Sequence, residues 1–292
     1  MGIEPGEAFQ RVAVLGAGTM GGGIAHVAAL AGYEVALYDV TGDLARSGLE
    51  RIRANLDTGV GKGKIRPGDR DRALAAIRTT GDLASAASGA DLVIEAAPED
   101  LDMKREIFRK LGEICGEEAL LATNTSSLSV SKIASAVPRP ERVVGLHFFN
   151  PPHIMKLIEI VRAWQTSDAS VKAAVAVAKR MGKEAVVVKD TPGFATSRLG
   201  LALGLEAMRM VEQGVASSED IDRAMELGYG HPMGPLRVSD LVGLDVRLAI
   251  AETLHRELGE AHFRPPDVLR EMVKAGRLGK KSGEGFHKWP KS

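Results

Sequence analysis

Short apolar runs alternate with longer segments of helical periodicity through the first two thirds of the chain. Residues 11–15, 34–38, 91–95 and 120–122 form such runs, and a polar or glycine-containing stretch follows each of them. Between the runs, apolar residues recur with the spacing of one helix face. Strands that alternate with helices are typical of a parallel sheet, so the pattern predicts an α/β fold for this part of the chain.

Two further apolar runs, at residues 142–147 and 156–161, flank the pair Pro151-Pro152, and residues 185–188 form a last short strand. We expect the chain to reverse direction between the two runs, with its centre near His153. His147 and Glu159 would then face each other across two neighbouring antiparallel strands.

A helical pattern interrupts the alternation between residues 42 and 77. Its apolar positions are Leu44, Leu49, Ile52, Leu56, Leu74 and Ile77. The segment 59–67 between them is rich in glycine and carries Lys62, Lys64 and Arg66. The pattern predicts a helical hairpin inserted after the second strand, with a basic tip. The three cations suit the phosphates of a large anionic substrate, although the segment alone is better explained as a solvated lysine loop.

The β pattern ends at a break over residues 189–193, where we place a domain boundary. The first domain then covers residues 1–190 and the second residues 191–292. In the second, helices are predicted at 194–213, in a short segment capped at 217–220, at 235–258 and at 266–275, before a basic tail with Phe286 and Trp289. The long helices of this small all-α domain carry much apolar surface, which favours packing against the first domain and against a second subunit.

Composition narrows the class of protein. The 292 residues include 38 basic and 38 acidic side chains, so no overall field favours nucleic acid or an anionic membrane. The one cysteine, Cys115, excludes a disulfide framework and is expected to be a small core residue. No segment approaches the roughly 20 apolar residues of a membrane span, and the first residues do not resemble a secretory signal. These features favour a protein of the cytoplasm.

A glycine-rich turn follows the first strand, opens a helix and precedes a second strand that ends in an acid. The turn is Gly16-Ala17-Gly18-Thr19-Met20-Gly21, and the acid is Asp39. This arrangement is typical of a Rossmann-type dinucleotide-binding domain. Gly16 permits the tight turn, Gly18 lets pyrophosphate approach the backbone, and Gly21 allows helix and strand to pack closely. Asp39 would accept hydrogen bonds from a ribose and repel a 2′-phosphate, which favours NAD over NADP.

Polar side chains follow two more of the predicted parallel strands. Glu99 comes after the strand at 91–95, and Asn124 and Ser126 come after the strand at 120–122. Carboxyl ends of parallel strands meet at the ligand crevice, so we expect these three residues near the nicotinamide end of the cofactor. Serine also commonly caps helices or forms turns, and we accept that role for Ser127 and Ser129.

The predicted pair of His147 and Glu159 has the composition of a general base. A carboxylate fixes the tautomer of a neighbouring imidazole and raises its basicity. Taken alone, the pair is more simply explained as a buried contact that joins two strands. Its position beside a predicted dinucleotide site favours catalysis. The sequence contains no His, Cys and Asp cluster with metal-ligand spacing.

Nearly the whole chain resembles the 3-hydroxyacyl-CoA dehydrogenase family, in particular its bacterial 3-hydroxybutyryl-CoA members. The resemblance rests on the glycine-rich turn and on segments 93–97 (VIEAA), 124–129 (NTSSLS), 147–151 (HFFNP), 155–159 (MKLIE), 190–194 (DTPGF), 231–235 (HPMGP) and 279–286 (GKKSGEGF). It implies reversible oxidation of an L-3-hydroxyacyl-CoA to the 3-ketoacyl-CoA, with NAD as hydride acceptor.

The resemblance also implies roles for single residues. His147 would take the hydroxyl proton, Glu159 would orient it, Ser126 would bind the 3-oxygen, and Asn150 would lie near the nicotinamide and help place His147. The cofactor set would be Gly16, Gly18, Thr19, Met20, Gly21, Asp39, Glu99, Lys104, Asn124 and Asn150. Lys62 and Lys64 would meet coenzyme A.

One position departs from the family pattern. Ser197 stands where the family commonly has an asparagine that contacts the substrate. Serine is shorter and offers one donor instead of two, so either water fills the gap or the substrate binds differently. The acyl chain length therefore stays open, and Ser197 remains a candidate contact.

Two other functions stay open at this point. A gulonate-type sugar-acid dehydrogenase would have the same architecture but no need for the basic tip. An NAD-binding protein without turnover would keep the glycine turn and Asp39 but would not need Ser126, His147 and Glu159 together. The resemblance also implies a homodimer formed through the helical domain.

Overall fold

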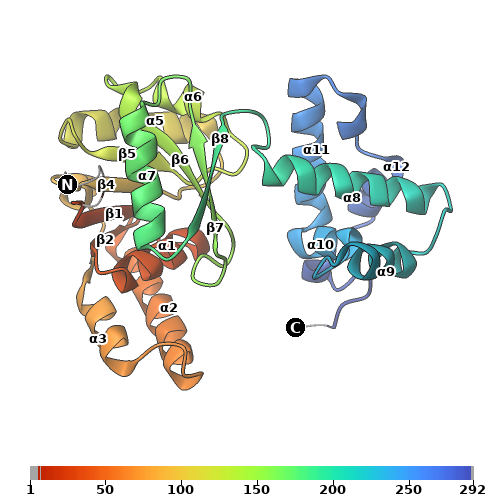
Figure 1. Cartoon of the computed structure of the whole chain (residues 1–292), viewed down its shortest axis with the longest axis horizontal. Helices are drawn as coiled ribbons and strands as arrows, with labels where there is room; N and C mark the ends of the chain where they lie inside the picture. Colours follow the sequence, from red (N-terminus) through yellow and green to blue (C-terminus); the bar gives the residue numbers. More distant parts are fainter. Residues whose placement is uncertain (1–5, 7, 291–292) are drawn as a thin grey trace. The chain divides into compact units, whose positions relative to one another are not determined.

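The chain divides into two compact units, Met1–Thr191 and Pro192–Ser292. The computed structural model describes residues 6 and 8–290. The first unit is a mixed sheet with helices, and the second is helical, as the sequence predicts. Figure 1 colours the two units by their order along the chain.

One sheet of eight strands organises the first unit, in the order β3-β2-β1-β4-β5-β6-β7-β8. Strands β1 to β6 are parallel to one another, β7 is antiparallel to β6, and β8 is parallel to β7. The strands are β1 (Arg11–Leu15), β2 (Glu34–Tyr38), β3 (Ile77–Thr80), β4 (Leu92–Glu95), β5 (Leu120–Thr123), β6 (Val143–Phe148), β7 (Leu157–Arg162) and β8 (Glu184–Lys189). Their bounds agree with the predicted runs to within about two residues, except for β3.

Strand β3 was missing from the sequence prediction, which assigned Ile77 to a helix. Ile77 is buried and pairs with Val35 at the edge of the sheet. The strand is only four residues long, and three of them are polar. An isolated apolar residue next to a helix fits either periodicity, so the hydrophobic pattern could not separate the two.

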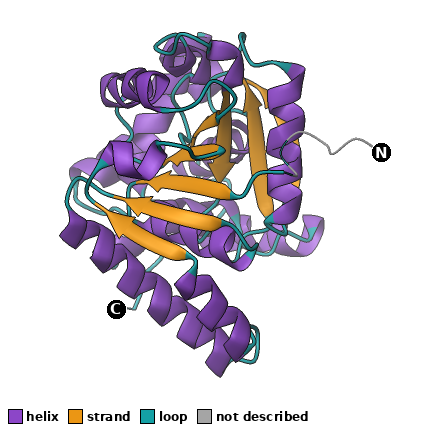
Figure 2. Ribbon diagram, turned by 90° about the vertical axis from the view of Figure 1, so that its left-hand side faces the viewer, coloured by secondary structure: helices purple, strands orange, loops and turns teal. Residues whose placement is uncertain are grey.

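Helices cover both faces of this sheet, which Figure 2 shows as orange strands between purple helices. Side chains of α1 and α7 join alternate strand residues in one core cluster, so these two helices lie on the same face. The helices of the first unit are α1 (Thr19–Leu30), α2 (Gly42–Gly61), α3 (Pro67–Ala75), α4 (Leu83–Ala87), α5 (Leu101–Ile114), α6 (Val130–Ala134) and α7 (Asp168–Arg180).

The predicted helical hairpin is present as α2 and α3, which contact each other and α1. Their connection, residues 62–66, carries the exposed side chains of Lys62 and Lys64. Gly59 allows the turn to close tightly, since a Cβ atom there would lie 2.5 Å from Cδ1 of Ile65. The hairpin therefore presents a basic tip, as the composition of the segment predicts.

The second unit contains five α-helices among its described residues. They are α8 (Thr196–Glu212), α9 (Ser218–Tyr229), α10 (Pro235–Val242), α11 (Leu244–Leu258) and α12 (Asp267–Lys274). The single helix predicted over 235–258 was wrong, because the chain breaks at Gly243. That residue has φ of +103°, a conformation that favours glycine and ends the helix.

The tail of the second unit is fastened by two buried carboxylates. Asp240 accepts hydrogen bonds from the backbone N–H groups of Phe286 and His287 and from Nε1 of Trp289, each at 2.9 Å. Asp222 lies 2.8 Å from Nε2 of His287. Phe286 and Trp289 of the tail therefore both donate to Asp240, and Phe286 also packs against the apolar core of the second unit.

Cys115 is buried at the end of α5, as expected for a core residue. Burial raises the pKa of its thiol to about 11, although the charge of Arg142 opposes that shift. The thiol therefore stays protonated near neutral pH and is a poor nucleophile.

Candidate active site

The glycine-rich turn joins β1 to α1 and leaves space beside its backbone. Gly16 has φ of +96°, and a Cβ atom on Gly21 would lie 1.7 Å from the carbonyl oxygen of Gly16. Neither position tolerates a larger residue without a backbone shift. A Cβ atom on Gly18 would meet no atom within 4 Å, so the space that this glycine leaves is open. The geometry agrees with the tasks predicted for the three glycines.

The first turn of α1 has the features of an anion site. Gly18 is the N-cap residue, and within the described chain no side chain caps the helix and no acidic residue lies in its first turn. Thr19 is exposed and Met20 half-buried. The N–H groups and partial positive charge of a helix start attract phosphate. These residues fit the pyrophosphate of a dinucleotide.

Asp39 lies just after β2 and holds the turn from the other side. Its Oδ2 accepts a hydrogen bond from the N–H group of Ala17 at 2.8 Å, and its Oδ1 accepts one from Val40 at 2.7 Å. Each carboxylate oxygen has a second lone pair, so the half-buried side chain retains capacity to accept from ribose hydroxyls.

His147 and Glu159 are paired directly across β6 and β7, as predicted. They are opposite one another in the antiparallel register, and Nδ1 of His147 lies 2.8 Å from Oε2 of Glu159. Glu159 is fully buried and His147 is 7% exposed. When Nδ1 carries the hydrogen and donates to Glu159, the lone pair of the ring lies on Nε2. The pair then has the composition and tautomer of a general base.

Asn124 and Asn150 both lie near the end of β6, the strand that carries His147. Oδ1 of Asn124 accepts a hydrogen bond from the N–H group of Phe148 at 2.9 Å, which ties the end of β5 to the end of β6. Asn150 is exposed two residues after β6, at the start of the loop that leads to β7. Both asparagines therefore flank the strand that carries His147.

The same loop packs against α1, the helix that follows the glycine-rich turn. A Cβ atom on Gly23 of α1 would lie 2.7 Å from Pro152, so the approach is close. The ring of His26 stacks on that of His153 at 5.1 Å, and Nζ of Lys183 donates to the carbonyl oxygen of Met155 at 2.7 Å. Burial, together with the charges of His153 and Lys183, lowers the pKa of His26 to about 4.

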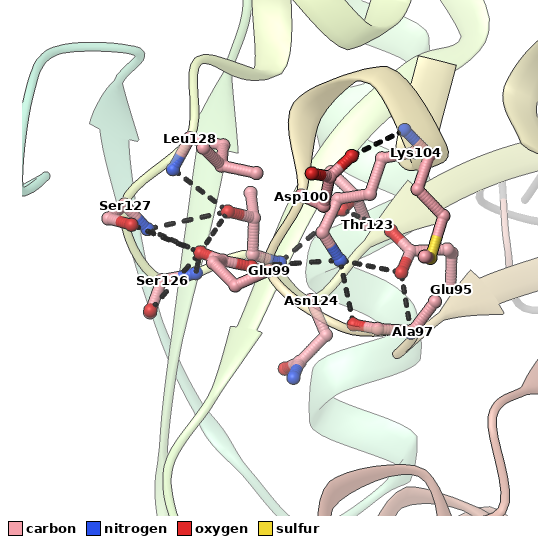
Figure 3. A network of polar contacts seen from close by, with 12 residues as sticks. Glu95, Ala97, Glu99, Asp100, Lys104, Thr123, Asn124, Ser126, Ser127 and Leu128 are labelled. Atoms are coloured by element: carbon pink, nitrogen blue, oxygen red, sulfur yellow. Dashed lines mark hydrogen bonds and ion pairs between the residues drawn. The ribbon is translucent and has the colours of Figure 1, made fainter. Parts of the chain in front are cut away.

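Ser126 lies in a loop that is gathered around Glu99. Oε1 of Glu99 accepts from Oγ1 of Thr125 at 2.6 Å, from the N–H groups of Ser126 and Ser127 at 2.9 and 3.0 Å, and from Oγ of Ser126 at 3.3 Å. Figure 3 shows this convergence. Burial acts to raise the pKa of Glu99, but the hydrogen bond from Thr125 and the charge of Lys104 outweigh it and lower the pKa.

Lys104 is enclosed within the protein. Its side chain is 1% exposed, and its ammonium lies 2.6 Å from Oε1 of Glu95, 3.1 Å from the carbonyl oxygen of Ala97 and 3.7 Å from Oε2 of Glu99. Lys104 therefore contacts Glu95 and Glu99 from within the protein and presents almost no surface of its own. The sequence prediction did not select Glu95, because it reads as the last residue of a buried strand.

The structure assigns the candidate residues to two units. Five of them lie in the first unit, at or just beyond the carboxyl ends of strands of one sheet: Gly16, Asp39, Glu99, Ser126 and His147. Ser197 belongs to the second unit, where it lies in the first turn of α8 and is half-buried. Lys62 and Lys64 stay on the hairpin tip.

The described part of the chain contains neither a metal-binding cluster nor a membrane-spanning helix. No group of three or more His, Cys, Asp or Glu side chains is arranged to hold a metal ion among the residues that the structure describes. No described helix is long and apolar enough to cross a membrane.

Known proteins share this architecture and sequence. The Mycobacterium tuberculosis 3-hydroxybutyryl-CoA dehydrogenase is 46% identical over 283 residues, which covers 96% of this chain and 99% of that protein. A probable 3-hydroxybutyryl-CoA dehydrogenase of Bacillus subtilis is 45% identical and covers 96% and 97%. The crystal structure of (S)-3-hydroxybutyryl-CoA dehydrogenase PaaH1 from Ralstonia eutropha superposes with a TM-score of 0.94 at 39% identity, covering 97% and 100%.

Family models match both units. The model described as 3-hydroxyacyl-CoA dehydrogenase, NAD binding domain, matches residues 11–191, and the model described as 3-hydroxyacyl-CoA dehydrogenase, C-terminal domain, matches residues 193–289. Together with relatives similar over almost the full chain, these matches show that the protein belongs to the NAD-dependent 3-hydroxyacyl-CoA dehydrogenase family.

Proposed function

We propose that this protein oxidises short-chain L-3-hydroxyacyl-CoA thioesters, 3-hydroxybutyryl-CoA first among them, to 3-ketoacyl-CoA with NAD, and catalyses the reverse reaction. The observation that carries the proposal is the buried contact of 2.8 Å between His147 and Glu159 at the sheet edge that also bears the glycine-rich turn. The names of the relatives favour a four-carbon acyl group.

The reaction needs a place for one proton. NAD, when bound, would supply the acceptor for the hydride that leaves C3 of the substrate. As the carbonyl forms, the hydroxyl proton passes to Nε2 of His147, and the charge that develops on the ring is balanced by Glu159 through Nδ1–H. In the reverse direction the imidazolium returns the proton to the 3-oxygen.

Ser126 is proposed to donate a hydrogen bond to the 3-oxygen of the substrate. A hydroxyl donor at that position stabilises the negative charge that develops as the proton leaves. Asn124, Asn150, Asp39 and Glu99 are proposed to contact or surround the cofactor. Thr19 and Met20 lie at the helix start that would hold its pyrophosphate.

Coenzyme A is proposed to meet the basic tip of the helical hairpin. Lys62 and Lys64 are exposed there, and ammonium groups are suited to its phosphates. Ser197 is proposed as a further substrate contact from the second unit. Because it is shorter than the family's asparagine, it leaves the preferred acyl length to be measured.

We also propose that the protein acts in the cytoplasm, in fatty acid metabolism, as a homodimer formed through its helical unit. Several large apolar side chains of that unit are exposed, which supports an oligomer. They are Leu199 (71%), Leu203 (36%), Leu241 (43%), Val242 (43%) and Val246 (40%).

One assay tests the reaction, the cofactor and the substrate class together. NADH consumption is measured with acetoacetyl-CoA, with NADPH in place of NADH, and with acetoacetate in place of the thioester. We expect rapid turnover only with NADH and the thioester. A folded protein that binds NADH but turns over none of these substrates would contradict the proposal.

A further inference from the structure

A fully buried ion pair lies beneath the loop that carries Ser126. Glu95 ends β4 and is 0% exposed, and Lys104 of α5 is 1% exposed. We propose that Glu95 and Lys104 are positioning residues: they fix Glu99, which in turn fixes the Ser126 loop for catalysis. This inference rests on the proposed role of Ser126.

Every oxygen of Glu95 has a partner. Oε1 accepts from Nζ of Lys104 and from the N–H group of Ala97, both at 2.6 Å, and Oε2 accepts from Oγ1 of Thr123 at 2.7 Å. Figure 3 shows these contacts beside Glu99. Glu95 thus joins the end of β4, the end of β5 and the first turns of α5. Those segments are the ones that place Glu99 and Ser126.

Stability alone does not require such a pair. Burying two charges costs desolvation free energy, and apolar residues of similar volume often serve a core equally well. What an apolar pair cannot supply is a fixed positive charge 3.7 Å from Oε2 of Glu99. The hydrogen bond from Thr125 and this charge together lower the pKa of Glu99, and the other oxygen of Glu99 accepts from the loop. The arrangement therefore serves position rather than net stability.

The number of donors around Glu99 identifies the group that is available to the substrate. Oε1 lies within hydrogen-bonding distance of five donors of Thr125, Ser126 and Ser127. A carboxylate oxygen offers about two lone-pair sites, so not all of these bonds can be strong together. The longest, at 3.3 Å, comes from Oγ of Ser126. The backbone of Ser126 is thus held while its hydroxyl can rotate toward the substrate oxygen.

Loss of the pair should loosen this loop without emptying the core. In the double variant Glu95→Gln with Lys104→Met, both side chains keep nearly the same length and no unpaired charge is buried. Glu99 then loses its cation, and its hold on the N–H groups of Ser126 and Ser127 weakens. Phe108→Leu, on the buried face of the same helix, is a matched control for a general loss of stability.

Two measurements test the inference. The first is hydrogen exchange at the amides of Ser126 and Ser127 in the protein without ligand, read against the amides of β5. We expect at least about tenfold faster exchange in the double variant and no selective change in Phe108→Leu. Unchanged exchange at both serines would overturn the inference whether or not the protein is an active dehydrogenase.

The second measurement is kcat with acetoacetyl-CoA and NADH, in the normal and in the Ser126→Ala background. We expect the double variant to lose about tenfold or more in kcat in the normal background and less than about twofold in the Ser126→Ala background, since residues that act as a unit are not additive. Equal losses in both backgrounds would mean a merely structural pair. Absence of turnover in the unaltered protein would instead contradict the proposed function, and the exchange result would still stand.

Discussion

At the scale of single residues, the candidate site contains carboxylates that hold neighbouring groups in place. Glu159 holds His147, Asp39 holds the glycine turn, and Glu99 gathers the Ser126 loop. His147 and Glu159 could be predicted from the sequence because their spacing is symmetrical about a reversal. The role of Glu95 could not be predicted, because its partner Lys104 reaches it only once α5 packs beside the end of β4.

The first prediction concerns the proposed base. His147→Gln removes the group that exchanges the proton, so kcat with acetoacetyl-CoA should fall by about 10²- to 10⁴-fold while NADH binding is retained. Glu159→Gln keeps a hydrogen-bond partner but removes its charge, so its loss should be smaller. The exposed His262 provides a control, since His262→Gln should have normal kcat. An active, folded His147→Gln protein would refute the assignment.

The second prediction concerns cofactor choice. Asp39→Ala removes the proposed acceptor for the ribose hydroxyls and the charge that repels a 2′-phosphate. Use of NADH, measured as kcat/KM, should therefore fall far more than use of NADPH. Asp43→Ala, at an acid in the first turn of α2, should leave the ratio unchanged. Equal losses with both cofactors after Asp39→Ala would show that this residue does not read the 2′-hydroxyl.

At the scale of elements, hydrophobic periodicity predicted the long strands and helices correctly. It failed for a short strand and for a helix that is broken by a glycine. Strand β3 has one buried apolar residue to signal it. The division of α10 from α11 depends on the backbone of Gly243, and glycine within a helical pattern is tolerated often enough to give no firm signal. In both cases the conformation is decided by packing against a neighbouring element, which the local sequence pattern does not show.

The third prediction separates two glycines of the turn. Gly21→Ala places a Cβ atom 1.7 Å from the carbonyl oxygen of Gly16, so it should lower the free energy of unfolding without ligand by roughly 1–3 kcal/mol or more. Gly18→Ala points into open space. It should cost less than about 1 kcal/mol yet weaken NADH binding about tenfold or more, or roughly 1.4 kcal/mol. Urea unfolding and fluorescence titration measure the two effects, and an exchange of the two phenotypes would contradict the role of Gly18.

The fourth prediction follows from the stacked rings of His26 and His153. The pKa of His26 is lowered from 6.5 to about 4, so the unfolded chain binds its proton first as pH falls. The stability that neutral His26 contributes is therefore complete above pH 6.5 and is lost as the pH falls toward 4. At pH 5 this lowers the free energy of unfolding by about 2 kcal/mol. His26→Phe keeps the stack and should remove this part of the pH dependence, measured by urea unfolding at pH 7.5 and pH 5. An undiminished pH dependence would mean that His26 is not the group responsible.

At the scale of the whole molecule, the chain combines a cofactor-binding unit with a helical unit that exposes apolar side chains. The division into α/β and all-α parts was visible in the sequence, because the strand pattern stops near residue 190. The sequence does not predict what binds the exposed surface of the helical unit, because a single chain shows only which apolar residues are exposed. An association state must therefore be measured.

The fifth prediction is that the protein sediments with twice the 31.0 kDa mass of one chain. Leu199 is 71% exposed in the helical unit, and Leu199→Asp should yield monomers because a buried unpaired charge opposes association. Ile154 is similarly exposed, at 65%, but lies in the first unit. Ile154→Asp should remain dimeric. A monomeric unaltered protein would contradict the proposed interface.

The antiparallel pairing of β6 and β7 separates the register of two facing residues from the course of the loop that connects the strands. The ladder alone sets His147 opposite Glu159, while the intervening residues 149–156 connect the strands from outside the ladder. A change in the length of that connection leaves the register that pairs His147 with Glu159 unaltered, as long as the ladder itself is kept. The pairing of the proposed base and the course of the connecting loop are thus encoded in separate stretches of sequence, so the loop can vary in evolution or by design while the pair is kept, provided that Asn150 is retained.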